Sequence, residues 1–104
     1  MANDQNMRVL IVDDEKAIRR LLKATLEAHD YNVFEASDGA EALKLAVNSY
    51  PDVIILDLGL PDMDGKEVIT AIREWSQVPI IVLSGRALDE DITAALNRGA
   101  NDYV

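Results

Sequence analysis

The stretch VIILDLGLPDMDG, residues 53–65, places an aspartate directly after an unbroken apolar run. A loop with one proline, two glycines and two further aspartates follows this residue, Asp57. A second stretch, RVLIVDDE at residues 8–15, repeats the arrangement, because its apolar run ends in two aspartates and a glutamate. Short runs rich in valine, isoleucine and leucine are typical of buried strands. The two stretches therefore predict two buried strands that each end in carboxylates.

Further apolar runs and helical patterns alternate along the rest of the chain. The runs are mostly apolar at successive positions, which predicts strands covered on both faces, as in a parallel sheet between layers of helices. Between the runs, apolar residues recur at three- and four-residue spacing, which predicts amphipathic helices. We expect strands at 9–12, 33–36, 53–56, 79–83 and from 101 onward, and helices at 15–28, after 38, at 66–75 and between 89 and 99.

The same spacing predicts helix ends and inward faces. Asp38, followed three residues later by Glu41, is a capping-box variant that predicts the start of the second helix. Gly99 suits the position that directly follows the fourth helix. The side chains expected to face the core are Ala17, Ile18, Leu21, Leu22, Thr25 and Leu26 in the first helix, Leu43, Ala46 and Val47 in the second, Val68, Ile69 and Ile72 in the third, and Ile92, Ala95 and Leu96 in the fourth.

The order of these elements, βαβαβαβαβ with short connections, predicts the fold. Right-handed crossovers turn that order into a doubly wound sheet, so we predict an α/β, flavodoxin-like fold with five parallel strands in the order 2-1-3-4-5. The sequence Asp13-Asp14-Glu15 stands where a dinucleotide fingerprint or a P-loop needs glycines, which disfavours nucleotide binding. Ligands of doubly wound sheets bind beyond the carboxyl ends of the strands, where the winding reverses.

Three acids are expected to meet at that edge. If the first and third strands are neighbours, about 4.8 Å apart, Asp13, Asp14 and Asp57 lie together. Their mutual repulsion, roughly 4 kcal/mol per pair at 4 Å, favours a bound cation, and oxygen-only ligation suits Mg²⁺. Calcium fits less well, because no EF-hand loop is present. The alternative is that each acid only ends its strand as a turn or capping residue.

Length and composition limit the class of protein. The chain has 104 residues, 49% of them hydrophobic and 28% charged, which fits one globular domain. Its net charge of −9 argues against nucleic-acid binding by this segment, and the lack of cysteine excludes disulfides and thiolate metal sites. No apolar run reaches the roughly 20 residues of a membrane span, so we expect a cytoplasmic protein without a membrane partner. Residues 1–6 are predicted as a disordered tail before a domain at 7–104.

Four motifs together resemble the receiver domain of bacterial two-component response regulators. They are the pair DD after the first strand, ILDLGLPDMDG around the third, VLSG after the fourth and RGANDYV before the fifth. The resemblance covers the chain from residue 7 onward. Within the family, the stretches DLGLPD and REWSQVPIIVLSGR look most like the branch of the OmpR/PhoB group that regulates a potassium-uptake operon.

The resemblance implies a metal and a phosphoryl group at the acids. Asp57 would be the phosphoacceptor, and Asp14 would be a direct ligand of Mg²⁺. Asp13 would bind the ion largely through water, and Gly59 would offer its backbone carbonyl. The domain would receive its phosphoryl group from a sensor histidine kinase and would not itself be an enzyme.

The resemblance also implies a switch. Ser84, which alone is a weak signal more typical of a turn, would donate a hydrogen bond to the new phosphoryl oxygens. Tyr103 would then turn inward behind it and change the surface of the fourth helix and fifth strand. The output would be DNA binding by a domain that is not part of this segment.

One departure from the family concerns the end of the chain. The family carries a lysine in a KP pair shortly after the DYV stretch, whereas this sequence ends at Val104. We therefore expect a truncated or processed part of a longer protein that lacks this lysine and the last helix. The absent helix would leave apolar surface open, so we also expect self-association.

Two other functions use a similar strand-end aspartate or a similar fold. A phosphatase of the haloacid dehalogenase type also uses a strand-end aspartate and Mg²⁺, but it needs a second aspartate two residues later, where Gly59 stands. A pseudo-receiver that binds partners without being phosphorylated stays open as the alternative.

Overall fold

Strands and helices alternate in the computed structural model, which describes residues 6–83, 85 and 87–104. All predicted elements are present, and their ends lie within one or two residues of the predicted ends. Residues 1–5 of the predicted tail lie outside the described residues. The strands are β1 (Arg8–Val12), β2 (Asn32–Ala36), β3 (Val53–Asp57), β4 (Ile80–Leu83) and β5 (Asp102–Tyr103), and the helices are α1 (Lys16–Glu27), α2 (Gly39–Asn48), α3 (Gly65–Arg73) and α4 (Asp89–Asn97).

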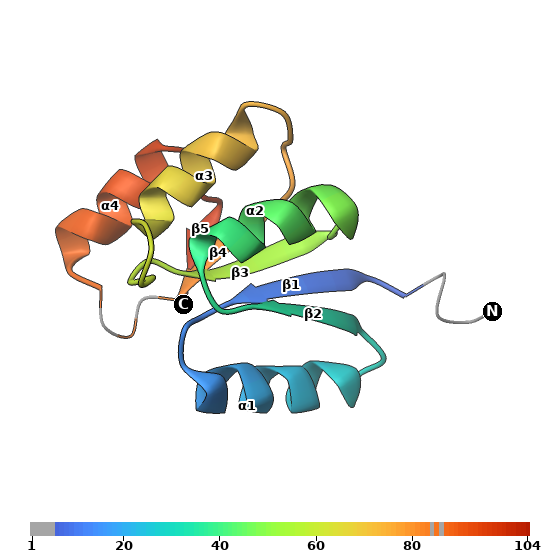
Figure 1. The fold of residues 1–104 in the computed structure, drawn as a ribbon. Helices are drawn as coiled ribbons and strands as arrows, with labels where there is room; N and C mark the ends of the chain where they lie inside the picture. The colour runs from blue at the N-terminus through green and yellow to red at the C-terminus, as the bar shows by residue number, and fades with distance from the viewer. Residues whose placement is uncertain (1–5, 84, 86) are drawn as a thin grey trace.

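The five strands form one parallel sheet in the order β2-β1-β3-β4-β5. In Figure 1, α1 lies on one side of the sheet, and α2, α3 and α4 lie on the other. This is the predicted doubly wound, flavodoxin-like fold. The winding reverses between β1 and β3, so the carboxyl ends of these two neighbouring strands share the edge at which ligands bind in such folds.

The main core lies between the sheet and the three helices α2, α3 and α4. The inward prediction for α3 is confirmed, because Val68, Ile69 and Ile72 are fully buried. These helix residues belong to one cluster with Ala42 and Ala46 of α2. The strands contribute Leu10, Val12, Ile54, Leu56, Ile80 and Val82, all of which are fully shielded from solvent.

The opposite face of the sheet is less completely covered. Ile11 of β1 is fully buried there, whereas Ile55, Ile81 and Leu83 of β3 and β4 are only half-buried. Among the described elements, α1 alone lies on this side, and it contacts β1 and β2. The half-buried residues of β3 and β4 agree with the expectation that part of the apolar surface on this side is left open.

Several helix residues expected in the core are exposed. Leu21 is 64% exposed, Val47 52% and Leu96 36%. In α2 and α4 the buried positions belong to the alanines Ala46 and Ala95, so the larger residue that follows each one turns outward. Helix α1 buries no residue completely, and its main contacts with the sheet are to β1 and β2. Its predicted inward face divides into half-buried Ile18, Leu22 and Leu26 and exposed Ala17, Leu21 and Thr25.

Two predicted helix ends are confirmed by their backbone contacts. The Asp38 carboxylate accepts the backbone N–H of Glu41 at 2.8 Å, and the Glu41 carboxylate accepts the N–H of Ser37 at 2.8 Å. Gly99 follows the last residues of α4 with a φ of +120°, a conformation that glycine adopts without strain. None of the described helices combines the length and the apolarity that crossing a bilayer requires.

Candidate functional site

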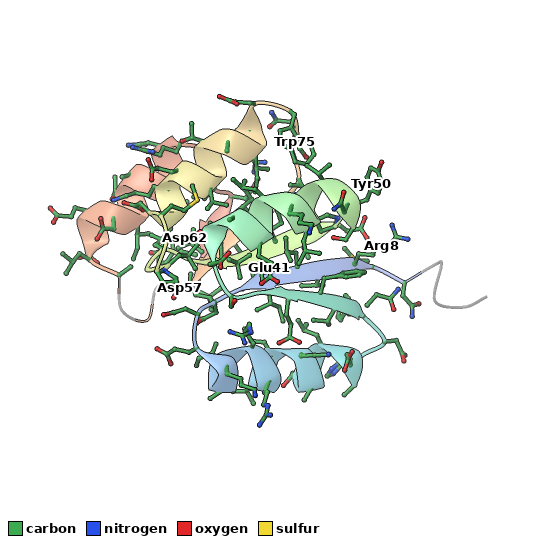
Figure 2. The ribbon with its side chains drawn as sticks, viewed as in Figure 1. Arg8, Glu41, Tyr50, Asp57, Asp62 and Trp75 are labelled. Carbon is green, nitrogen blue, oxygen red and sulfur yellow. The ribbon has the colours of Figure 1, made fainter. Side chains whose placement is uncertain are left out.

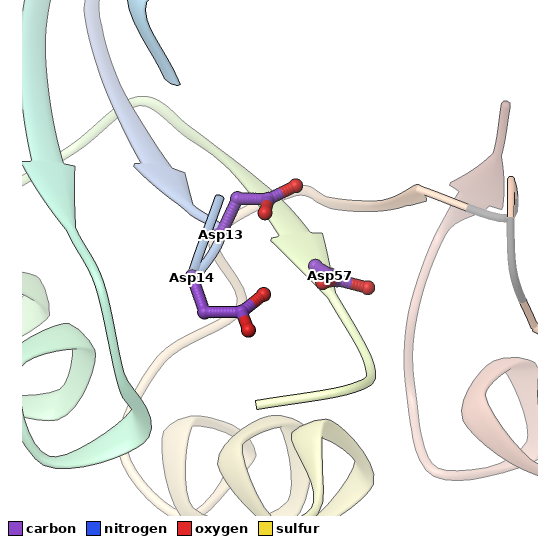
Figure 3. Close-up of side chains that lie close together, drawn as sticks. All are labelled: Asp13, Asp14 and Asp57. Atoms are coloured by element: carbon purple, nitrogen blue, oxygen red, sulfur yellow. The ribbon is translucent and has the colours of Figure 1, made fainter. Parts of the chain in front are cut away.

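The predicted acids come together at the edge where β1 and β3 end. Residues Val12 and Leu56 are paired in the sheet, so the aspartates that follow them emerge side by side. One carboxylate oxygen from each of Asp13, Asp14 and Asp57 lies within 4.8 Å of the others. Figure 3 shows the three side chains grouped where the two strands end. The predicted juxtaposition of the three carboxylates is confirmed.

Asp13 is buried and takes part in two backbone hydrogen bonds. It is 4% exposed, its N–H donates to the carbonyl of Ala36 at 3.1 Å, and its carboxylate accepts the N–H of Glu15 at 2.8 Å. Burial raises the pKa of Asp13, although the bond from Glu15 acts in the opposite direction, and the nearby charge of Asp57 raises the pKa further. The ionised form of Asp13 is therefore disfavoured here unless a positive charge binds.

Asp57 ends β3 and is 8% exposed. The backbone N–H of Gly59 donates to its carboxylate at 3.2 Å, so the loop after β3 folds back towards the acid. The first residue of helix α3, Gly65, packs against the backbone of Asp57 and Leu58. A Cβ on Gly65 would come within 2.9 Å of the Asp57 carbonyl oxygen and 2.6 Å of the Leu58 Cα, so only glycine allows this approach.

Arg19 of α1 supports the site from behind, a role that the sequence did not suggest. Its Nη1 donates to the backbone carbonyl of Asp13 at 2.8 Å, and its Nε lies 3.4 Å from the Glu35 carboxylate. The side chain is only 16% exposed. An arginine in an amphipathic helix looks like a solvent-facing residue, so no sequence signal could have identified this contact.

Two hollows flank Asp57. One of about 600 Å³ lies between the loop after β3 and the start of α4, and Lys66 and Asp91 line it. The Nζ of Lys66 donates to Asp91 at 2.7 Å and lies 3.5 Å from Asp64. The second hollow, of about 410 Å³, lies on the α1 side, between Ile18 and Leu83. A small reactant can therefore approach Asp57 from either side.

The predicted switch residues are placed only in part. Ser84 lies outside the described residues. Tyr103 lies on β5, paired with Val82, and it is 50% exposed, so its side chain is not buried in this structure. Gly59 lies beside Asp57 as expected, and its role as a carbonyl ligand stays a prediction.

Comparison with known proteins identifies the family. The family model of the response regulator receiver domain matches residues 9–104. The chain belongs to the response regulator receiver family. This family is a signalling module and not a class of enzymes, as the sequence predicted.

The curated relatives are transcriptional regulators. The chain is 54% identical over 96 residues to the KDP operon transcriptional regulatory protein KdpE of Escherichia coli K12. These residues make up 92% of the chain and 43% of that protein. It is 50% identical to KdpE of Mycobacterium tuberculosis H37Rv, and the match covers 92% of the chain and 42% of that protein. It is 46% identical to SrrA of Staphylococcus aureus NCTC 8325, and this match covers 92% of the chain and 40% of that protein. The chain thus spans about two-fifths of these relatives' lengths. The similarity to KdpE agrees with the branch that the sequence predicted.

Solved receiver structures share the fold. A CheY-like receiver domain from Methanospirillum hungatei JF-1 superposes with a TM-score of 0.89 at 34% identity, covering 95% of this chain and 80% of that one. The BeF3-activated receiver domain of Klebsiella pneumoniae RstA gives a TM-score of 0.88 at 30% identity, covering 93% and 83%. The acidic triad is thus set in a receiver fold.

Proposed function

We propose that this receiver domain accepts a phosphoryl group on Asp57 in a reaction that depends on Mg²⁺. The observation that carries the proposal is the group of three carboxylate oxygens, from Asp13, Asp14 and Asp57, within 4.8 Å at the point where the winding of the sheet reverses. The donor is a sensor histidine kinase, the partner that membership of the family implies.

The chemistry of the donor set fits Mg²⁺. All three side chains offer hard carboxylate oxygens, and Asp14 is exposed, which leaves room for the several waters that Mg²⁺ retains. In our proposal Asp14 and Asp57 ligate the ion directly, Asp13 acts largely through water, and Gly59 adds its backbone carbonyl. A bound Mg²⁺ would offset the repulsion between the carboxylates and the incoming phosphoryl group.

Asp57 is the nucleophile of the proposed reaction. One of its carboxylate oxygens forms a bond to phosphorus while the phosphorus–nitrogen bond of a phosphohistidine breaks and the imidazole leaves. The N–H of Gly59 donates to Oδ1 of Asp57 and thereby orients the carboxylate for attack. Most of the catalysis of such a transfer comes from positioning and charge neutralisation; the site positions Asp57, and a bound Mg²⁺ would neutralise part of the charge.

The relatives support a proposal for the output of the domain. Phosphorylation adds negative charge beside Asp57, Ser84 moves to donate a hydrogen bond to it, and Tyr103 turns inward. The similarity to KdpE supports control of transcription, including that of a potassium-transport operon, through a DNA-binding domain of the whole cytoplasmic protein. This segment itself does not contact DNA, because its net charge is −9.

A phosphoryl-transfer experiment tests the proposal. A version of the chain extended to include the family's lysine is incubated with Mg²⁺ and a small acyl phosphate, and its intact mass is measured. We expect one added phosphoryl group in the wild type and none in Asp57→Asn. Asp30→Asn is the matched control, because Asp30 is exposed and its φ of 67° suits asparagine.

Two outcomes would contradict the proposal. A phosphorylated Asp57→Asn protein would show that the acceptor is wrong. An extended wild type that binds a kinase but never gains phosphoryl mass would favour the pseudo-receiver.

A further inference from the structure

A carboxylate from the loop after β3 is bound to the start of α2. Oδ1 of Asp62 accepts the N–H of Gly39 at 2.7 Å, and Oδ2 accepts the N–H of Ala40 at 2.9 Å. Figure 2 labels Asp62 beside the start of this helix, at the same end of the molecule as Asp57. These bonds join segments that lie more than 20 residues apart in the sequence. They hold the pKa of Asp62 below its usual range.

The start of α2 has its own cap, so these bonds do more than complete a helix end. Asp38 already occupies the N-cap position and accepts the N–H of Glu41 at 2.8 Å. The first N–H groups of a helix lack partners inside the helix. The Asp62 carboxylate accepts two of these N–H groups and thereby holds the loop against α2.

A second contact at the same place shows how closely the loop approaches. Gly39 is buried, and a Cβ added to it would collide with Cγ and Sδ of Met63, the residue after Asp62. A larger residue at this position would therefore force the Met63 side chain to move. The loop is held against α2 both by hydrogen bonds and by close packing.

The other end of the loop is part of the acidic site. Gly59 and Asp64 form an isolated antiparallel bridge, and the N–H of Gly65 donates to the carbonyl of Leu58 at 2.9 Å. These contacts make the loop a short hairpin. Its base lies at Asp57, which accepts the N–H of Gly59, and its far end is fastened to α2. The bridge between Gly59 and Asp64 thus connects the far end of the loop to the residue beside Asp57.

We propose that Asp62 is a positioning residue for the metal site: by clamping the loop to α2, it fixes Gly59 against Asp57 and so sets the affinity for Mg²⁺. This inference rests on the proposed function, because it assumes that Mg²⁺ binds at the acids. Residues that orient metal ligands typically change metal affinity by about 10- to 100-fold when they are removed. We expect the lower end of that range, because Asp62 acts through the backbone of the loop.

Three variants separate the clamp from its charge and from helix capping. Asp62→Ala removes both acceptors and the charge. Asp62→Asn removes the same charge but keeps one acceptor oxygen, so it retains half of the clamp. Asp38→Ala removes a carboxylate and a cap from the same helix end, but Asp38 has no hydrogen bond to the loop in the described contacts. Each 104-residue protein is titrated with MgCl₂ while amide shifts are followed by NMR, and thermal melts verify folding.

The expected result is graded. Asp62→Ala should weaken Mg²⁺ binding about tenfold, Asp62→Asn should weaken it less, and Asp38→Ala should leave it within about twofold of the wild type. Hydrogen exchange of the Gly39 and Ala40 amides should be faster in Asp62→Ala, and the Gly59 amide should shift without metal. Both the hydrogen exchange and the shift of the Gly59 amide are measured without Mg²⁺.

Each contrary result has its own meaning. Equal weakening in Asp62→Ala and Asp62→Asn would show that only the charge matters and would overturn the inference. Unchanged affinity in Asp62→Ala, or equal losses in Asp62→Ala and Asp38→Ala, would overturn it as well. A wild type that shows no Mg²⁺ response at the three acids would refute the proposed metal site, and this inference with it.

Discussion

Arg19 and Asp13 are joined by a hydrogen bond from the guanidinium of one to the backbone carbonyl of the other, 2.8 Å long. The bond ties α1 to the turn that carries two of the three acids. Glu35 of β2 holds the same guanidinium from the other side, with 3.4 Å between its carboxylate and Nε of Arg19. Arg19 therefore fixes the position of the acid pair and places a positive charge behind it.

Replacing Arg19 tests this role. We expect Arg19→Ala to lower the free energy of unfolding by about 1–2 kcal/mol, because a partly buried charged hydrogen bond is lost. It should also weaken Mg²⁺ binding, since the turn at Asp13 loses its support. Lys23→Ala is the matched control, because Lys23 pairs with the same Glu35 at 3.4 Å. Chemical denaturation and Mg²⁺ titration of both variants measure the two effects. If Arg19→Ala and Lys23→Ala bound Mg²⁺ with equal affinity, Arg19 would not be the residue that supports the acid pair.

Asp13→Asn should stabilise the chain when no divalent cation is present. Burial and the charge of Asp57 disfavour the ionised form of Asp13 in the folded state, whereas asparagine is neutral and keeps an oxygen for the N–H of Glu15. We therefore expect Asp13→Asn to melt at a higher temperature than the wild type at pH 7. Thermal melts in EDTA measure this difference. A variant that melts below the wild type would contradict the expectation.

The same variant has a defined pH dependence. Because the folded-state pKa of Asp13 is raised, its contribution to stability is fully present below the unfolded-state pKa and is lost as the pH rises through the folded-state value. The advantage of Asp13→Asn should therefore shrink as the pH falls from 7 towards 4. Saturating Mg²⁺ should reverse its sign at pH 7, because the ion stabilises only the protein that binds it well.

The acidic site could be predicted from the sequence because its residues are fixed by strand ends. Asp13, Asp14 and Asp57 each follow an apolar run, and the right-handed crossover rule makes the first and third strands neighbours. The residues that support the site could not be predicted in this way. Arg19 and Asp62 bind backbone groups of other elements, and in a sequence they look like ordinary solvated charges.

Helix periodicity had a similar limit. It identified the apolar stripe of α1, but it could not show how much of the sheet that stripe would cover. The spacing along α3 succeeded because this helix is packed on a closed core, where Val68, Ile69 and Ile72 are fully buried. On the side of α1, exposure depends on which other segments lie on the sheet, and local sequence does not contain that information.

The half-covered face of β3 and β4 leads to the last prediction, which is that this 104-residue chain self-associates. Ile55, Ile81 and Leu83 are half-buried there, although the other face of the same strands is fully buried. A large exposed apolar patch favours association, and each Å² buried contributes about 25 cal/mol. Only the part of this gain that exceeds the roughly 4–15 kcal/mol cost of association appears as binding energy, so we expect a weak dimer with a micromolar to millimolar Kd.

Paired substitutions on this face test the prediction. Ile55→Thr with Ile81→Thr keeps β-branched residues in both strands but removes apolar surface from the exposed side, so we expect the dimer Kd to rise about tenfold or more. Leu21→Gln is the control, because Leu21 is 64% exposed on the outer side of α1, away from β3 and β4. Static light scattering over a concentration series measures the mass of each protein. A wild type that stays monomeric at millimolar concentration would refute the prediction, and an equal loss of association in Leu21→Gln would move the interface from the sheet to α1.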